Sequence, residues 1–249
     1  MVGGPAAVLG MSRPRAAALG LALGFLVIWD AGAGALPDVG ETLDVGVLAM
    51  MLLPATFLVA LIALPLAPAR GLLPVAAALG VLAFLLYLAD LGALFNVTKV
   101  LALTAAGFWF LQLFEALSWV VLVALIVPWV DAASVWRGPT DYVVSEKPSL
   151  FEQVSIAFRL PGGDGSAHIG PPDILFFALF LATAARFRLR VVWTWVAAVG
   201  LLALSLITTV LFDIDGVPAL PAISLGFLLP NADRLWKAWR ARGLETSRS

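Results

Sequence analysis

Long runs of apolar residues alternate along this chain with short segments that carry most of its charges. A helix needs about 20 mostly apolar residues to cross a hydrocarbon core of about 30 Å. Stretches that meet or approach this length predict transmembrane helices over residues 16–36, 45–67, 71–91, 93–114, 115–136, 170–185, 191–212 and 217–235. The pattern therefore predicts an all-α, polytopic membrane protein with about eight transmembrane helices.

The composition supports this interpretation and excludes several classes of function. Hydrophobic residues make up 62% of the 249 residues and charged residues only 12%, against about 25% charged residues in a typical soluble domain. The net charge of −1 lacks the basic excess of a nucleic-acid-binding protein. With no cysteine and one histidine, the chain cannot form a disulfide or a Cys- or His-rich metal site. We expect no metal, no cofactor and no nucleic-acid partner.

The basic residues of the connections predict the orientation, because cytoplasmic loops carry an excess of Lys and Arg. Eleven of the fifteen basic residues fall on one side: Arg13, Arg15, Arg70, Arg186, Arg188, Arg190, Arg234, Lys237, Arg240, Arg242 and Arg248. Both termini are therefore expected in the cytoplasm of a multi-pass protein of the cell membrane. The long connection 137–169, whose Gly, Pro and Ser content marks it as a loop, is expected outside.

The first predicted span has a second interpretation. Arg13 and Arg15, the apolar stretch after them and the small residues Ala31-Gly-Ala33 also resemble the three regions of a signal peptide. Cleavage there would leave seven spans and an external N-terminus. The pattern leaves both possibilities open.

Ionisable residues inside the spans are candidates for function, because a charge in hydrocarbon is costly. Asp30 and Asp90 lie near span ends, where the interface is within reach. Lys99 and Glu115 occupy opposite ends of the fourth span, and we expect each of them to extend to water.

Asp131 and Asp173 differ from these residues because one external loop joins their two helices. The helices are then antiparallel neighbours, and the two carboxyl groups lie at similar depth. Two carboxyl groups a few ångström apart cannot both ionise, so one can act as a base on water while the other polarises a carbonyl. The structural alternative is that both acids form interhelical hydrogen bonds or cap a helix.

Two short motifs accompany these aspartates. Ile169-Gly-Pro-Pro-Asp173 opens an apolar helix, and Val217-Pro-Ala-Leu-Pro221 opens the last predicted span. Asp173 follows Asp131 by 42 residues, and Pro218 follows 45 residues later. The order and spacing of these motifs resemble those of the presenilin and signal peptide peptidase family of intramembrane aspartyl proteases. The chain looks like a short, bacterial- or archaeal-like member of that family.

The resemblance covers about half of the chain and implies a division into three parts. These are an N-terminal four-helix transmembrane region (1–114), a presenilin-like catalytic transmembrane region (115–237) and a basic cytoplasmic tail (238–249). It also implies catalysis by Asp131 and Asp173, and substrates that are transmembrane segments of proteins or signal-peptide remnants within the lipid bilayer. The residues implied in substrate binding are Gly170, Pro172, Pro218, Ala219 and Leu220.

Two positions depart from the family pattern and keep other functions open. Val130 stands where the family usually has tyrosine, and Pro172 stands where it has glycine. A catalytically inactive member that binds membrane helices is therefore one alternative. A proton-coupled transporter with Asp131 and Asp173 as relay acids is another, although no internal repeat supports it. A prepilin-peptidase-like enzyme would leave the Pro-Ala-Leu-Pro segment unexplained.

Overall fold

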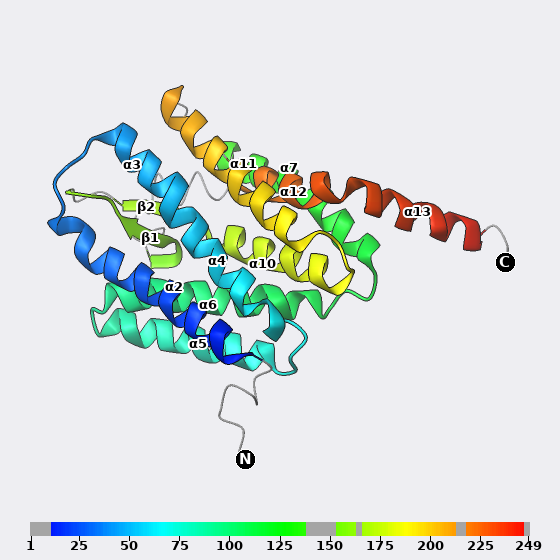
Figure 1. Ribbon diagram of the computed structural model, residues 1–249, viewed down its shortest axis with the longest axis horizontal. Helices are drawn as coiled ribbons and strands as arrows, with labels where there is room; N and C mark the ends of the chain where they lie inside the picture. The colour runs from blue at the N-terminus through cyan, green and yellow to red at the C-terminus, as the bar shows by residue number, and fades with distance from the viewer. Residues whose placement is uncertain (1–10, 138–152, 163–165, 213–217, 247–249) are drawn as a thin grey trace, which may run out of the picture.

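The computed structural model describes residues 11–137, 153–162, 166–212 and 218–246, which form a helical bundle with one small β-hairpin (Figure 1). The helices are α2 (Arg13–Gly32), α3 (Glu41–Val47), α4 (Leu53–Ala63), α5 (Leu72–Leu88), α6 (Gly92–Leu111), α7 (Leu117–Arg137), α10 (Pro171–Arg186), α11 (Val191–Leu211), α12 (Leu220–Leu228) and α13 (Ala232–Thr246). Each predicted span contains a helix. Within the described residues, five helical segments are long and apolar enough to cross a membrane. The chain is thus an all-α membrane protein.

The second predicted span is a single helical segment of mixed type. A π-helical turn, η2 (Leu48–Leu52), joins α3 to α4, and the backbone N–H of Leu53 donates to the carbonyl of Leu48, five residues earlier. Pro54 follows at once and has no N–H to continue the α-helical ladder. Such π turns occur as single turns inside α-helices, and here the helix continues into α4 after it.

Helix α10 lies in the centre of the bundle, in contact with α4, α6, α11 and α12 (Figure 1). Its residues from Phe177 to Ala184 are all buried. This burial on every side explains why the 16-residue helix is mostly apolar. A methyl group at Gly107 of α6 would collide with the backbone of Leu175 and the side chain of Ala178. The absence of a side chain at Gly107 therefore allows α6 and α10 to pack at close range.

The connection 137–169 contains a β-hairpin, so the prediction of a loop was wrong for its second half. Strand β1 (Ile156–Arg159) pairs antiparallel with β2 (Ser166–Ile169), and Ile156 lies opposite Ile169. Ile156, Phe158 and Ile169 are buried against the bundle. Residues 138–152 lie outside the part that the structure describes.

Polar side chains from two helices hold this hairpin. Lys99 of α6 donates to the backbone carbonyls of Gln153 and Ser155, and Asn96 accepts from the backbone N–H of Ala157. Asp30 of α2 accepts from the backbone N–H of Arg159 at 3.4 Å. Lys99 is only 9% exposed, so the expectation that it extends to water was wrong: it binds the hairpin instead.

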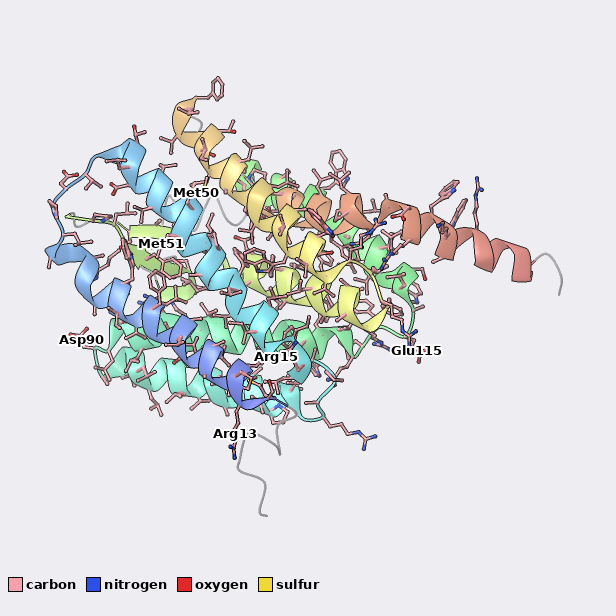
Figure 2. The ribbon with its side chains drawn as sticks, in the orientation of Figure 1. Arg13, Arg15, Met50, Met51, Asp90 and Glu115 are labelled. Atoms are coloured by element: carbon pink, nitrogen blue, oxygen red, sulfur yellow. The ribbon has the colours of Figure 1, made fainter. Side chains whose placement is uncertain are left out.

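Several basic residues of the described chain gather at one end of the bundle. Arg15, Arg70 and Arg186 line one cavity where several helices begin or end, and Arg190 pairs with Asp233 nearby along the chain. Asp30 and Asp90 line a small pocket with Arg159 beside the hairpin. Figure 2 shows Asp90 at the opposite end of the bundle from Arg13 and Arg15. The gathered basic residues follow the basic connections of the sequence, but Asp233 lies among them and Arg159 lies beside the acids.

Candidate active site

Asp131 lies on the packed side of α7. The two residues before it face outward, since Trp129 is 78% exposed and Val130 is 61% exposed. Val120 and Ala124, which precede Asp131 by about three and two helical turns on the same side, are buried. Val130, the residue that departs from the family pattern, therefore points away from the face that carries Asp131.

The Pro-Ala-Leu segment meets this aspartate directly. Pro218 and Leu220 are buried, and α12 begins at Leu220 with Ala219 as its N-cap residue. The backbone N–H of Leu220 donates to Asp131 Oδ2 at 2.9 Å, and the N–H of Ala219 interacts with the same carboxylate. The first N–H groups of a helix have no partner within it. Asp131 therefore supplies the cap that the alanine side chain cannot.

Asp173 lies in the first turn of α10, immediately after the hairpin. Strand β2 ends at Ile169, Gly170 is the N-cap residue in an extended conformation, and Pro171 opens the helix. Proline fits a first helical turn because no intrahelical bond is lost there. Asp173 Oδ2 accepts from the backbone N–H of Gly170 at 3.1 Å. A Cβ at Gly170 would lie 3.0 Å from that same oxygen, so glycine leaves the carboxylate its place.

The two aspartates are near enough to interact electrostatically. Helix α7 contacts both α10 and α12, and α10 contacts α12. The structure thus brings together Asp131, Asp173 and the segment Pro218-Ala219-Leu220, which lie far apart in the sequence. Pro172 is exposed at the start of α10.

A cavity of about 190 Å³ opens beside Asp173. At about 30 Å³ for each water molecule, this volume accommodates several. Its lining is mostly apolar, with polar groups from Asp173, His168, Ser205 and Thr209. Ala219 belongs to the lining as well, so the Pro-Ala-Leu segment borders both the carboxylate of Asp131 and the cavity at Asp173.

Several lining residues carried no signal in the sequence. Leu48, Leu53 and Phe57 come from the second predicted span, and Ser205 and Thr209 come from α11. These are ordinary residues of an apolar helix, so only the packing shows that they border the site. The upstream region 1–114, which contains no recognised motif, therefore contributes one wall of the cavity.

The arrangement can do two things chemically. Asp173 borders a space that admits water and lies within electrostatic reach of Asp131, and two interacting carboxyl groups can divide the roles of acid and base. Each carboxylate also caps a helix, Asp131 that of α12 and Asp173 that of α10. Among the described residues, no group of three or more His, Asp or Glu side chains is placed to hold a metal ion.

Comparison of the chain with protein families, with curated proteins and with solved structures found no match.

Proposed function

We propose that this protein is an intramembrane aspartyl protease related to presenilin and signal peptide peptidase. The observation that carries the proposal is the contact between Asp131 and the Pro-Ala-Leu segment, with Asp173 close enough to interact with Asp131. Asp131, Asp173 and the Pro-Ala-Leu segment follow the order of that family and lie close together, with a cavity beside Asp173 and Ala219. In the proposed topology the chain has eight spans and cytoplasmic termini, and the hairpin lies on the external side of the cell membrane.

In the proposed reaction, Asp131 and Asp173 share a single proton. The ionised carboxylate takes a proton from water as the water oxygen attacks the scissile carbonyl carbon, and the protonated partner gives its proton to the carbonyl oxygen. The carboxyl group that took the proton from water then gives it to the amide nitrogen, and the carbon–nitrogen bond breaks. One hydroxyl group of the intermediate passes its proton to the other carboxylate, which restores the pair and releases an acid and an amine. Because the pair titrates as a unit, the cleavage rate should fall at both low and high pH.

The surroundings of the pair favour a membrane-embedded peptide as substrate. The cavity wall is largely apolar, and the chain at Pro218 and Ala219 is not yet helical. Irregular backbone at membrane depth is tolerated only beside protein or a polar cavity, and it can hydrogen-bond an extended peptide. The proposed substrates are transmembrane segments and signal-peptide remnants.

The test is cleavage of a transmembrane reporter peptide by the purified full-length protein in lipid vesicles. Asp131→Asn and Asp173→Asn should each abolish cleavage, whereas the matched variant Asp90→Asn should cleave like the wild type. Asp90 suits this control because it lies in the turn between α5 and α6 with a φ of 58°, a conformation that asparagine tolerates. Equal cleavage by all four proteins would refute the proposed dyad.

The second candidate is a non-catalytic protein that binds membrane helices. It is favoured by the capping contacts, because each aspartate has a structural task that needs no reaction. In that case the wild type would cleave none of several reporter peptides, yet would crosslink to them as efficiently as the two asparagine variants.

A further inference from the structure

A second, larger cavity lies away from the aspartates, among the ends of five helices. Its volume is about 1440 Å³, above the range of about 300–1,000 Å³ that is common for small-molecule sites. It is bordered by the start of α2, the end of α4, the end of α6, the end of α10 and the start of α11. None of the residues in its lining belongs to the proposed active site.

The charges of this cavity are all of one sign. Arg15, Arg70 and Arg186 belong to the described lining, and no aspartate or glutamate does. Arg186 is fixed in position, because its Nη1 donates to the carbonyls of Leu111 and Phe114 at 3.2 and 2.9 Å. Among the described residues, one ion pair is found, between Arg190 and Asp233. The three cavity arginines therefore have no carboxylate partner in that part of the chain.

Apart from Gln112, whose side chain donates to the carbonyls of Ala67 and Ala69, the remaining lining is apolar and extends along the helices from the arginines. Ala18 follows Arg15 by about one turn of α2, and Ala182 precedes Arg186 by about one turn of α10. Leu61 and Val192 complete the apolar wall. The cavity thus has a cationic rim at the helix ends and a hydrocarbon-like interior one turn further along. An amphiphile with an anionic head and a long acyl chain has this same division.

We infer that this cavity binds an anionic phospholipid, with its phosphate on the guanidinium groups of Arg15, Arg70 and Arg186 and an acyl chain along the apolar wall. Guanidinium groups bind phosphate through charge-assisted hydrogen bonds. The chain itself places these arginines at one end of the bundle, at the headgroup level of the leaflet whose surface is anionic. The size and the apolar wall of the cavity distinguish the ligand from a free phosphate ion.

The test is native mass spectrometry of the full-length protein in detergent with equal amounts of phosphatidylglycerol and phosphatidylcholine of the same acyl chains. The wild type should retain more phosphatidylglycerol than phosphatidylcholine. Arg15→Gln/Arg70→Gln should lower this retention by about 30-fold, at about one kilocalorie per mole for each basic group near a membrane surface. Arg13→Gln is the matched control, because Arg13 lies in the same helical turn as Arg15 but outside the cavity lining.

Two further measurements test the lipid assignment independently of the arginine variants. Ala18→Trp keeps all three arginines and fills the apolar part, so it should also lower retention of phosphatidylglycerol, even where the double variant fails to fold. Inorganic phosphate at millimolar concentration should not displace the lipid. Equal retention of both lipids by the wild type, equal loss in Arg13→Gln, full retention in Ala18→Trp or displacement by phosphate would each overturn the assignment.

Discussion

The carboxylate of Asp131 and the backbone N–H of Leu220 are joined by a hydrogen bond of 2.9 Å, although 89 residues separate them in the chain. The bond lets one helix cap another: Asp131, on α7, satisfies an N–H group at the first turn of α12. It also fixes the position of the carboxyl group that we propose as half of the catalytic pair. Different substitutions of Asp131 can therefore distinguish its structural role from its proposed catalytic role.

Asp131→Asn and Asp131→Ala should therefore differ in stability but not in activity. Asparagine keeps an oxygen that accepts from Leu220, whereas alanine removes the cap at a cost of about 1 kcal/mol. Neither residue can exchange a proton, so both should lower the cleavage rate by at least about 100-fold. Thermal unfolding in detergent and the reporter assay measure the two effects. Cleavage by Asp131→Asn at the wild-type rate would leave only the structural role.

Lys99 and Asn96 of α6 both bind the hairpin next to Asp173, and Lys99 makes two of these hydrogen bonds. Lys99→Met removes the donor to the carbonyls of Gln153 and Ser155, and unsatisfied buried carbonyls cost about 1–3 kcal/mol. Hydrogen exchange of the β1 amides should therefore be about tenfold faster or more, because local opening becomes easier.

The matched control is Lys237→Met on the exposed surface of α13, which should leave exchange in β1 unchanged. Since β2 leads directly into Gly170 and Asp173, Lys99→Met should also lower the cleavage rate. Unchanged exchange in β1 would show that Lys99 does not hold the hairpin.

The helices were predictable from the sequence, but the hairpin and the cavity wall were not. Apolar runs of the required length mark a helix in a bilayer, because lipid forces the backbone to satisfy its own hydrogen bonds. Strands of four residues leave no comparable pattern, and β1 and β2 depend on partners such as Asp30 and Lys99, far away in the chain. The topology of one connecting loop predicted the proximity of α7 and α10. Nothing in the apolar sequence around Phe57 indicated that it borders Asp173.

The orientation can be tested because the chain contains no cysteine. Ser12 and Ser166 are both exposed, and the basic end of the bundle predicts that Ser12 lies inside the cell and Ser166 outside. A membrane-impermeant maleimide should label Ser166→Cys in intact cells and Ser12→Cys only after permeabilisation. The reverse labelling would invert the proposed orientation. A Ser12→Cys protein that loses its N-terminal segment would instead support the signal-peptide interpretation.

Gly226 of α12 determines how closely that helix packs on α11. A methyl group at this position would overlap the backbone of Ala198, so the two helices would have to separate. Such overpacking costs about 1–3 kcal/mol, and we expect Gly226→Ala to unfold at a lower temperature. Because α12 begins at the Asp131 contact, the same change should also lower the cleavage rate.

Gly200→Ala, on α11, is the matched control, because a methyl group there meets nothing within 4 Å. Alanine is the better helix former by about 1 kcal/mol, so Gly200→Ala should unfold at the same temperature as the wild type or higher, with cleavage unchanged. The two variants make the same chemical change in adjacent helices, and only their surroundings differ. Equal unfolding temperatures for both variants would show that the close approach of α11 and α12 at Gly226 is not required for stability. The position of Pro218-Ala219-Leu220 would then have to depend on the contact with Asp131 rather than on α11.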